Sequence, residues 1–311
     1  MIVSNRGSVF GLLFWQWRNV LLFTIAAILV YTGYNYSGLV FQWNGWKIDL
    51  QLPGMPLAVV GAALGIFVSF RTNSAYDRWW EGRKLWGRLI NSSRHFCTQV
   101  LSYVDSEGGR HRKEIEQIVR RHIAYVHVLR CGLRQQDSFA DASVKEFLEP
   151  DEYESLKGSN NLNHALLQLQ QDQLVRLADA GVIDHFRLQS MDRTIAALLD
   201  IQGGCERIKK TPMPRGYGFI AERLILAYGC MFPLAVVHQL GILVIPINVL
   251  VCLSFALISE AGRVLEDPFT MYYNGLPLSA LSSTIELNLR QRLGETELPA
   301  MPTPDERGIL M

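Results

Sequence analysis

Three apolar residues recur at intervals of four within one long apolar stretch: Ala62, Ile66 and Phe70. At that spacing they form a single row along a helix. If several copies of the chain surround an axis, the row becomes stacked rings of apolar side chains, and a narrow apolar ring blocks ions by losing its water. The same stretch carries Gly61 and Gly65, small residues that permit close helix packing. Helix packing and an ion barrier are therefore both open interpretations of this stretch.

Residues that could perform enzymatic chemistry lack suitable partners in the sequence. Glu260, Glu266 and Asp267 cluster without a nucleophile or base beside them, and His122 and His127 stand five residues apart, on different faces of a helix. Phosphate-binding, hydrolase, zinc-protease and dinucleotide motifs are absent from the sequence. The five cysteines include no CxxC pair, so no disulfide or zinc framework follows. The sequence predicts that the protein is not an enzyme and has no cofactor.

The apolar residues are concentrated in two blocks of the chain. The 311 residues are 49% hydrophobic and 19% charged, and the net charge of +1 gives no reason to expect a nucleic-acid partner. A membrane-spanning helix needs roughly 20 mostly apolar residues. Four stretches approach that length, two near the N-terminus and two nearer the C-terminus: 17–36, 52–70, 224–237 and 240–258. The short connections predict two transmembrane hairpins, of which the third span is the shortest.

Basic residues flank these stretches asymmetrically. They precede the first and third stretches and follow the second and fourth: Arg6, Arg18, Arg71, Arg78, Arg83, Lys84, Arg88, Lys209, Lys210, Arg215, Arg223 and Arg263. The two outer turns hold only Lys47. Since cytoplasmic flanks carry the excess of Lys and Arg, we expect both termini to be cytoplasmic.

The chain is accordingly expected to divide into four segments. Residues 1–70 contain the first hairpin, 71–216 a cytoplasmic helical region, 217–258 the second hairpin and 259–311 a cytoplasmic helix and tail. Apolar stripes at helical spacing run from Ile115 to Leu133, from Leu162 to Leu177 and from Met191 to Ile201, the last ending at the C-cap signal of Gly203 and Gly204. A further helix is predicted over 279–293, and breaks at 106–109, 135–143, 157–161 and 211–218. The predicted fold class is an all-α membrane protein.

Two motifs carry a family resemblance. SFRTNSAYDRWWEGR, beginning at Ser69, resembles the sequence that bacterial bestrophin homologues carry directly after their second membrane helix. LEDPF (265–269) and NGLPL (274–278), after the fourth stretch, match the family as well. Together with the four-span layout, the resemblance to the bestrophin ion channels covers the chain to about residue 290.

The resemblance implies a homo-pentamer around a central pore lined by the helix at 52–70. Ala62, Ile66 and Phe70 would then be the neck of that pore. Arg71, Arg78, Trp79 and Trp80 would brace its inner end, although an interfacial anchor that only sets membrane depth explains these residues too. A second, cytosolic aperture is a family feature, and we place it at Ile183, for which an ordinary core position is the alternative.

The function implied is passive ion conduction across the bacterial inner membrane, with lipids and permeant monovalent ions as partners. Bacterial members are associated with sodium-type cation conduction, which is our expectation; a chloride or anion channel and a membrane-anchored scaffold are the alternatives. Animal members bind calcium with an acidic run after the motif equivalent to LEDPF. The residues here, TMYYNGLPL, hold no carboxylate, so we expect no calcium clasp.

Overall fold

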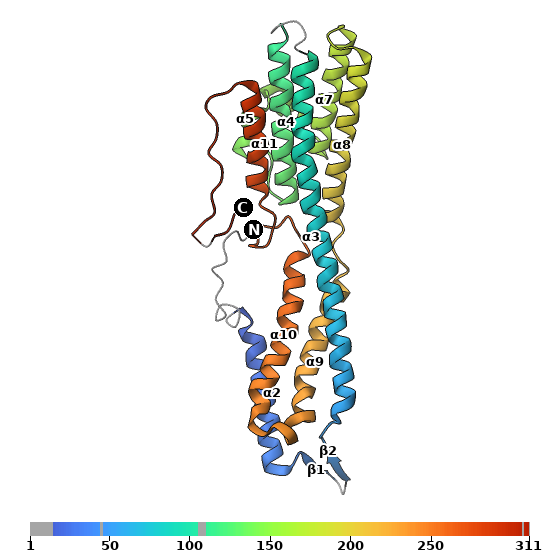
Figure 1. Cartoon of the computed structure of the whole chain (residues 1–311), viewed down its shortest axis with the longest axis vertical. Coiled ribbons are helices and arrows are strands. Elements are labelled where there is room, and N and C mark those ends of the chain that lie inside the picture. The colour runs from blue at the N-terminus through green and yellow to red at the C-terminus, as the bar shows by residue number, and fades with distance from the viewer. Residues whose placement is uncertain (1–14, 44–45, 105–109, 307, 311) are drawn as a thin grey trace. The chain divides into compact units, whose positions relative to one another are not determined.

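The computed structural model describes residues 15–43, 46–104, 110–306 and 308–310. Arg6 and the predicted break at 106–109 lie outside the described residues. The elements follow one another as α2 (Trp17–Ser37), β1 (Val40–Trp43), β2 (Trp46–Asp49), α3 (Gly54–Val104), α4 (Arg112–Leu133), α5 (Ala142–Phe147), α6 (Pro150–Leu156), α7 (Leu162–Asp179), α8 (His185–Lys210), α9 (Arg215–Leu240), the 3₁₀ turn η1 (Gly241–Leu243), α10 (Val244–Leu265) and α11 (Leu278–Leu293) (Figure 1). The predominantly helical fold is confirmed.

The elements form two compact units. Unit 1 holds Trp79–Thr211 and Asp267–Met311, and unit 2 holds Arg6–Arg78 and Pro212–Glu266, in each case as far as these residues are described. The helix α3 contributes its first half to unit 2 and its second half to unit 1.

Unit 2 is built from apolar helices packed at close range. Figure 1 shows α2, α9 and α10 side by side, and each of the three contacts the other two. A Cβ built on Gly229 would lie 2.5 Å from the ring of Phe23, so only glycine permits the approach of α9 to α2. The fully buried amide of Asn248 on α10 donates to the carbonyl oxygens of Phe23 (2.9 Å) and Gly229 (3.2 Å). This amide ties all three helices together.

Three helical stretches of the described chain are long and apolar enough to cross a membrane: Trp17–Ser37, a part of Gly54–Val104, and Gly216–Leu265. The third stretch contains α9 and α10, which η1 joins. The α9 helix runs for 26 residues and is longer than the short span predicted over 224–237, because the helix begins at Arg215 inside the predicted break and Pro233 does not end it. The number of four spans stays a prediction.

The connection between the first two predicted spans is a small antiparallel ribbon. Strands β1 and β2 pair from Val40 with Asp49 to Trp43 with Trp46. The sequence analysis predicts a short connection there but no strands.

Unit 1 packs amphipathic helices around a large apolar core. Trp86, Phe96 and Tyr125 are fully buried in it. The predicted helices over 115–133, 162–177 and 279–293 are confirmed by α4, α7 and α11.

The predicted end of the third stripe at Gly203 and Gly204 is wrong, because α8 continues to Lys210. A Cβ on Gly204 would lie 3.0 Å from the Leu85 methyl groups. This glycine therefore serves close packing of α8 against α3 and does not cap a helix.

Candidate functional site

The predicted neck residues lie on a face of α3 that the described residues of unit 2 leave uncovered. Ala62 is exposed, and Ile66 and Phe70 are 59% and 70% exposed. Further towards the start of the helix, Met55 and Val59 continue the same uncovered face at 81% and 65% exposure. An apolar row of this length is costly in water, so it requires lipid, another protein surface or a narrow pore around it.

The opposite face of α3 is packed. Leu64 and Val68 are buried in the apolar core of unit 2. A Cβ on Gly61 would lie 2.6 Å from the Tyr228 hydroxyl oxygen, and one on Gly65 would lie 3.4 Å from the ring of Phe255. The glycines therefore pack against α9 and α10, and the row of Ala62, Ile66 and Phe70 points away from them. The interpretation of the row as an ion barrier stays a prediction.

Directly after the row, Arg71 joins α3 to α10. Its side chain is almost fully buried, and its Nη1 and Nη2 donate to Ser259 Oγ (2.9 Å) and Glu266 Oε1 (2.6 Å). A Cβ on Gly218 would lie 3.0 Å from Nη2, so the start of α9 approaches the same guanidinium. A buried charge with two partners holds helices in register. These contacts fit a brace better than an interfacial anchor.

Arg78 adds a second connection between α3 and the end of α10, because its Nε donates to the carbonyl oxygen of Glu266 (2.7 Å). Between the two arginines, the Thr72 hydroxyl donates to the carbonyl oxygen of Ile258 (3.0 Å), and a Cβ on Gly262 would lie 2.9 Å from Thr72 Oγ1. The backbone of α3 after Phe70 is thus fastened to α10 over two helical turns.

The two family motifs meet within unit 1. Trp79 Nε1 donates to the carbonyl oxygen of Asn274 (2.9 Å), and a Cβ on Gly82 would lie 3.0 Å from Pro268 Cγ and 3.3 Å from the ring of Phe269. Trp80 stacks on Trp79 with ring centroids 6.3 Å apart and is itself 46% exposed. Trp79 and Gly82 of the first motif therefore pack against the loop that follows α10. The sequence alone does not reveal this contact.

Ile183 lies in the turn between α7 and α8. Only 3% of it is exposed, and it belongs to the apolar core of unit 1. This burial favours the core alternative, and the cytosolic aperture at Ile183 stays a prediction without an exposed side chain to support it.

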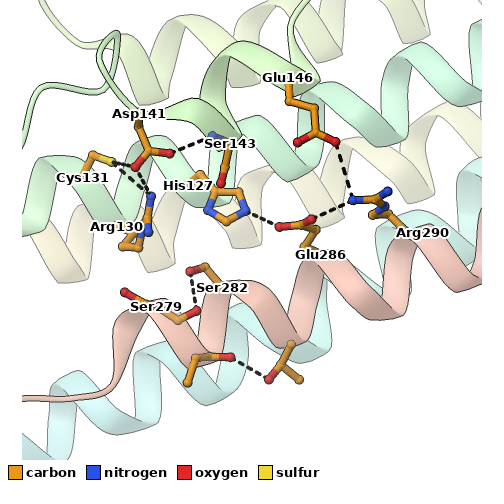
Figure 2. A network of polar contacts seen from close by, with 12 residues as sticks. His127, Arg130, Cys131, Asp141, Ser143, Glu146, Ser279, Ser282, Glu286 and Arg290 are labelled. Atoms are coloured by element: carbon orange, nitrogen blue, oxygen red, sulfur yellow. Dashed lines mark hydrogen bonds and ion pairs between the residues drawn. The ribbon is translucent and has the colours of Figure 1, made fainter. Parts of the chain in front are cut away.

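A buried polar network fastens α11 to α4 and α5 (Figure 2). His127 Nε2 lies 2.9 Å from Glu286 Oε2, and Arg290 contacts Glu286 (3.1 Å) and Glu146 (3.6 Å). Burial alone would raise the pKa of Glu286, but hydrogen bonds and charge from His127 and Arg290 outweigh burial and hold it below its ordinary value. Glu286 is therefore ionised in the fold.

The sequence analysis missed this network, although one signal for part of it was present. Glu286 and Arg290 are four residues apart on a predicted helix, the spacing of an intrahelical ion pair. Nothing in the sequence places His127 beside them. Its ring stacks on Phe147 with centroids 6.3 Å apart, which fixes the imidazole from the other side.

No group of three or more His, Cys, Asp or Glu side chains within the described ranges is arranged to hold a metal ion. In unit 2, Glu266 is bound to Arg71, and in unit 1 Asp267 pairs with Lys209 (2.7 Å). The absence of a calcium clasp stays a prediction.

Comparison with known proteins identifies relatives over nearly the whole chain. A model of the bacterial and fungal bestrophin family matches residues 1–291. The voltage-dependent anion channel-forming protein YneE of Salmonella typhi is 30% identical over 307 residues, which are 99% of this chain and 95% of the relative. YneE of Escherichia coli K12 is 30% identical over 284 residues, 91% of this chain and 88% of the relative.

Solved structures agree with the family match. A crystal structure of a bacterial bestrophin homologue from Klebsiella pneumoniae superimposes with a TM-score of 0.80 at 28% identity, covering 89% of this chain and 98% of that one. A mutant of the Klebsiella homologue gives the same TM-score at 26% identity, with the same coverage of each chain. This chain belongs to the bacterial and fungal bestrophin family.

Proposed function

We propose that the protein is an oligomeric channel for monovalent anions, with its neck at Ala62, Ile66 and Phe70. The observation that carries this proposal is the uncovered row on α3, of which Ile66 and Phe70 are 59% and 70% exposed while the opposite face is packed. Apolar side chains of this kind, arranged around an axis, form a barrier that water and ions cross only when it widens. Family membership and the apolar helices support a channel in a membrane and give no support to an enzyme.

Assembly follows from the same row. One chain cannot surround a conduit with a single exposed helix face, so several copies must place their α3 helices around one axis. The number five comes from the family resemblance. In such a homo-pentamer the Arg71 brace fixes the end of each neck helix, because it anchors the residue that follows Phe70 to α10.

The sign of the conducted ion is where the proposal departs from the sequence analysis. The relatives in Salmonella, Escherichia and Mesorhizobium are all named voltage-dependent anion channel-forming proteins. These names favour the anion alternative over the sodium-type conduction expected from the sequence. An apolar neck carries no charge and cannot distinguish anions from cations by their sign. Selectivity for anions must therefore come from charges elsewhere on the conduction path.

Exposed charges on α3 could supply that choice. In unit 1, Lys84 and Arg88 are exposed and stand four residues apart, on one face of the helix. In unit 2, Asp77 is exposed and carries the opposite charge. If five copies contribute Lys84 and Arg88 to one vestibule, the two basic rings concentrate anions there.

Reversal potentials in asymmetric NaCl test the proposal. The purified protein in planar bilayers should give currents that reverse near the chloride equilibrium potential. Lys84→Gln combined with Arg88→Gln should move the reversal potential towards zero, and the matched change Asp77→Asn should move it the other way. Reversal near the sodium equilibrium potential would restore the cation channel, and absence of flux in every salt, with intact oligomers, would leave the membrane-anchored scaffold.

The location proposed is the bacterial inner membrane, with both termini in the cytoplasm. The basic residues that flank the apolar stretches support this orientation, among them Arg18 and Arg223. Lipids would contact the apolar side chains of unit 2 that stand exposed away from α3, such as Leu29 and Leu250 at 66% each. Activation by calcium is not part of the proposal.

A further inference from the structure

Arg290 and Arg292, two residues apart on α11, have opposite surroundings. Arg290 contacts Glu286, Glu146 and Glu295, and Figure 2 shows the first two of these contacts. Arg292 is exposed, and no carboxylate of the described chain lies within ion-pair distance of it. The two side chains leave the helix in different directions. The carboxylates that pair with Arg290 therefore do not reach Arg292.

The free guanidinium of Arg292 borders a groove of about 400 Å³ between α3 and α11. Arg94 and Thr98 stand four residues apart on the α3 wall, and Asn288 and Arg292 stand four apart on the α11 wall. Arg94 Nε donates to Asn288 Oδ1 (2.8 Å), which links the two walls. This bond occupies one nitrogen of Arg94, and among the described residues its two terminal nitrogens have no carboxylate partner.

The floor of the groove is apolar and uncharged. Cys97 and Leu289 lie there, each 1% exposed. Burial raises the pKa of the Cys97 thiol to about 11, although the positive charge of Arg292 acts in the opposite direction. The thiol is therefore protonated at neutral pH and cannot act as the counter-ion of the two arginines.

Two other grooves of unit 1 are lined by carboxylates as well as by basic side chains. Beside the start of α7, Lys209 pairs with Asp267 and Lys210 with Glu206. Near the start of α4, a groove is lined by more carboxylates than basic side chains. Among the described residues, no carboxylate lines the groove at Arg94 and Arg292.

Helix position explains part of this arrangement. Arg292 stands in the last turn of α11, where the helix dipole favours a positive charge. That effect accounts for a basic residue at this position, but it does not occupy the donors of the guanidinium. It also offers no reason for Arg94, which lies ahead of the last turns of α3, to face the same groove.

We propose that this groove binds the phosphate group of a small soluble molecule, either inorganic phosphate or a phosphate monoester. Two guanidinium groups present paired N–H donors that match phosphate oxygens, and the Gln291 side-chain amide lies on the same groove as a further donor. The apolar floor strengthens these contacts because it excludes water from one side of the anion. The site does not depend on whether the protein conducts anions or cations.

Calorimetric titration of the assembled, full-length protein tests the site, with inorganic phosphate and glycerol phosphate as separate probes in the presence of chloride. Arg94→Gln combined with Arg292→Gln should weaken binding at least tenfold. Arg193→Gln is the matched control, because Arg193 is an exposed arginine of α8 that lies outside the groove. It should bind both probes as the unaltered protein does.

Two further measurements separate recognition from simple attraction. Arg292→Lys keeps the charge but loses the planar fork, and should weaken binding several-fold; equal affinity in this variant would show that charge alone acts there and would overturn the proposed recognition. Binding of either probe alone still supports the site and identifies its source. Unchanged binding in the double variant, an equal loss in Arg193→Gln, or displacement of phosphate by equimolar chloride would overturn it. The double variant should lower the melting temperature little, since both side chains are exposed and the Arg94–Asn288 hydrogen bond that it removes lies at the surface.

Discussion

In unit 2, large apolar side chains such as Leu29 and Leu250 stand two-thirds exposed (66% each), whereas in unit 1 the polar side chains of His122 and Gln170 are fully buried. The first pattern suits a surface that contacts lipid, a neighbouring copy or a dewetted pore. In the second pattern, Gln170 Nε2 lies 3.4 Å from His122 Nδ1, so each of these buried polar side chains has the other as a partner. An exposed apolar side chain in unit 2 therefore marks a surface that contacts another apolar medium. A buried polar side chain in unit 1 marks a specific contact inside the core.

The same contrast appears along α3 itself. Its exposed face carries Ile66 and Phe70 in unit 2 but Lys84 and Arg88 in unit 1. In the proposed channel, the barrier to ions and the preference for their sign would therefore reside in separate parts of one helix. Changes in either unit should consequently affect different properties of the protein.

The largest effect is expected where unit 1 buries charge. Glu286→Ala leaves His127 and Arg290 without their shared carboxylate, and should lower the free energy of unfolding by about 3–5 kcal/mol. Denaturant unfolding of the assembled protein in detergent measures this change. Glu116→Gln removes an exposed partner of Arg112 and should cost about 0.5 kcal/mol or less. Similar losses of unfolding free energy in the two variants would show that burial does not make the Glu286 ion pairs stronger than the exposed pair.

A pH-dependent effect is expected from His122, whose ring packs against Phe96 and Tyr125. Burial lowers the pKa of His122 from 6.5 to about 4, with a weaker opposing effect from Gln170. As the pH falls from 7 to 4, the His122 imidazole takes up a proton in the unfolded chain but stays largely neutral in the folded chain. The free energy of unfolding should therefore decrease by about 3 kcal/mol over this range.

Stability measured at several pH values checks this expectation. His122→Gln should remove that part of the pH dependence, whereas His164→Gln, at an exposed position, should retain it. A profile that is the same in both variants would show that another group causes the loss at acidic pH.

A smaller effect is expected where unit 2 packs most closely. Gly61→Ala places a methyl group 2.6 Å from the Tyr228 hydroxyl oxygen and should destabilise the protein by about 1–3 kcal/mol. Tyr228→Phe should rescue part of that loss when the two changes are combined, because it removes the clashing oxygen. Thermal unfolding provides the comparison, with Gly54→Ala as a control in open space. A loss that Tyr228→Phe leaves untouched would mean that the contact lies elsewhere.

Much of the fold could be predicted because its determinants are local. Hydrophobic periodicity predicts α4, α7 and α11, and uninterrupted apolar length predicts the helices of unit 2. The end of α8 at Lys210 could not be predicted, since Gly203 and Gly204 resemble a helix cap and only the approach of Leu85 explains Gly204. Glycine has the same local signature whether it ends a helix or permits a contact.

The candidate site was predictable to a similar degree. The spacing of Ala62, Ile66 and Phe70 predicts one face of one helix, which the structure leaves uncovered. The partners of Arg71 could not be predicted, because Ser259 and Glu266 lie almost 200 residues away in sequence. The same holds for His127 and Glu286, which only the packing of α11 against α4 brings together.

The central claim is that the uncovered row on α3 faces an aqueous conduction path, and accessibility of a cysteine in that row tests it most directly. Of the native cysteines only Cys230 is exposed, so Cys230→Ser provides the background. In that background, Ile66→Cys should react with a charged, water-soluble thiol reagent and its current should change, whereas Ile220→Cys, an exposed apolar position of α9, should keep its current. An Ile66→Cys channel whose current the reagent leaves unaltered, or a protein that purifies as single protomers, would contradict the account.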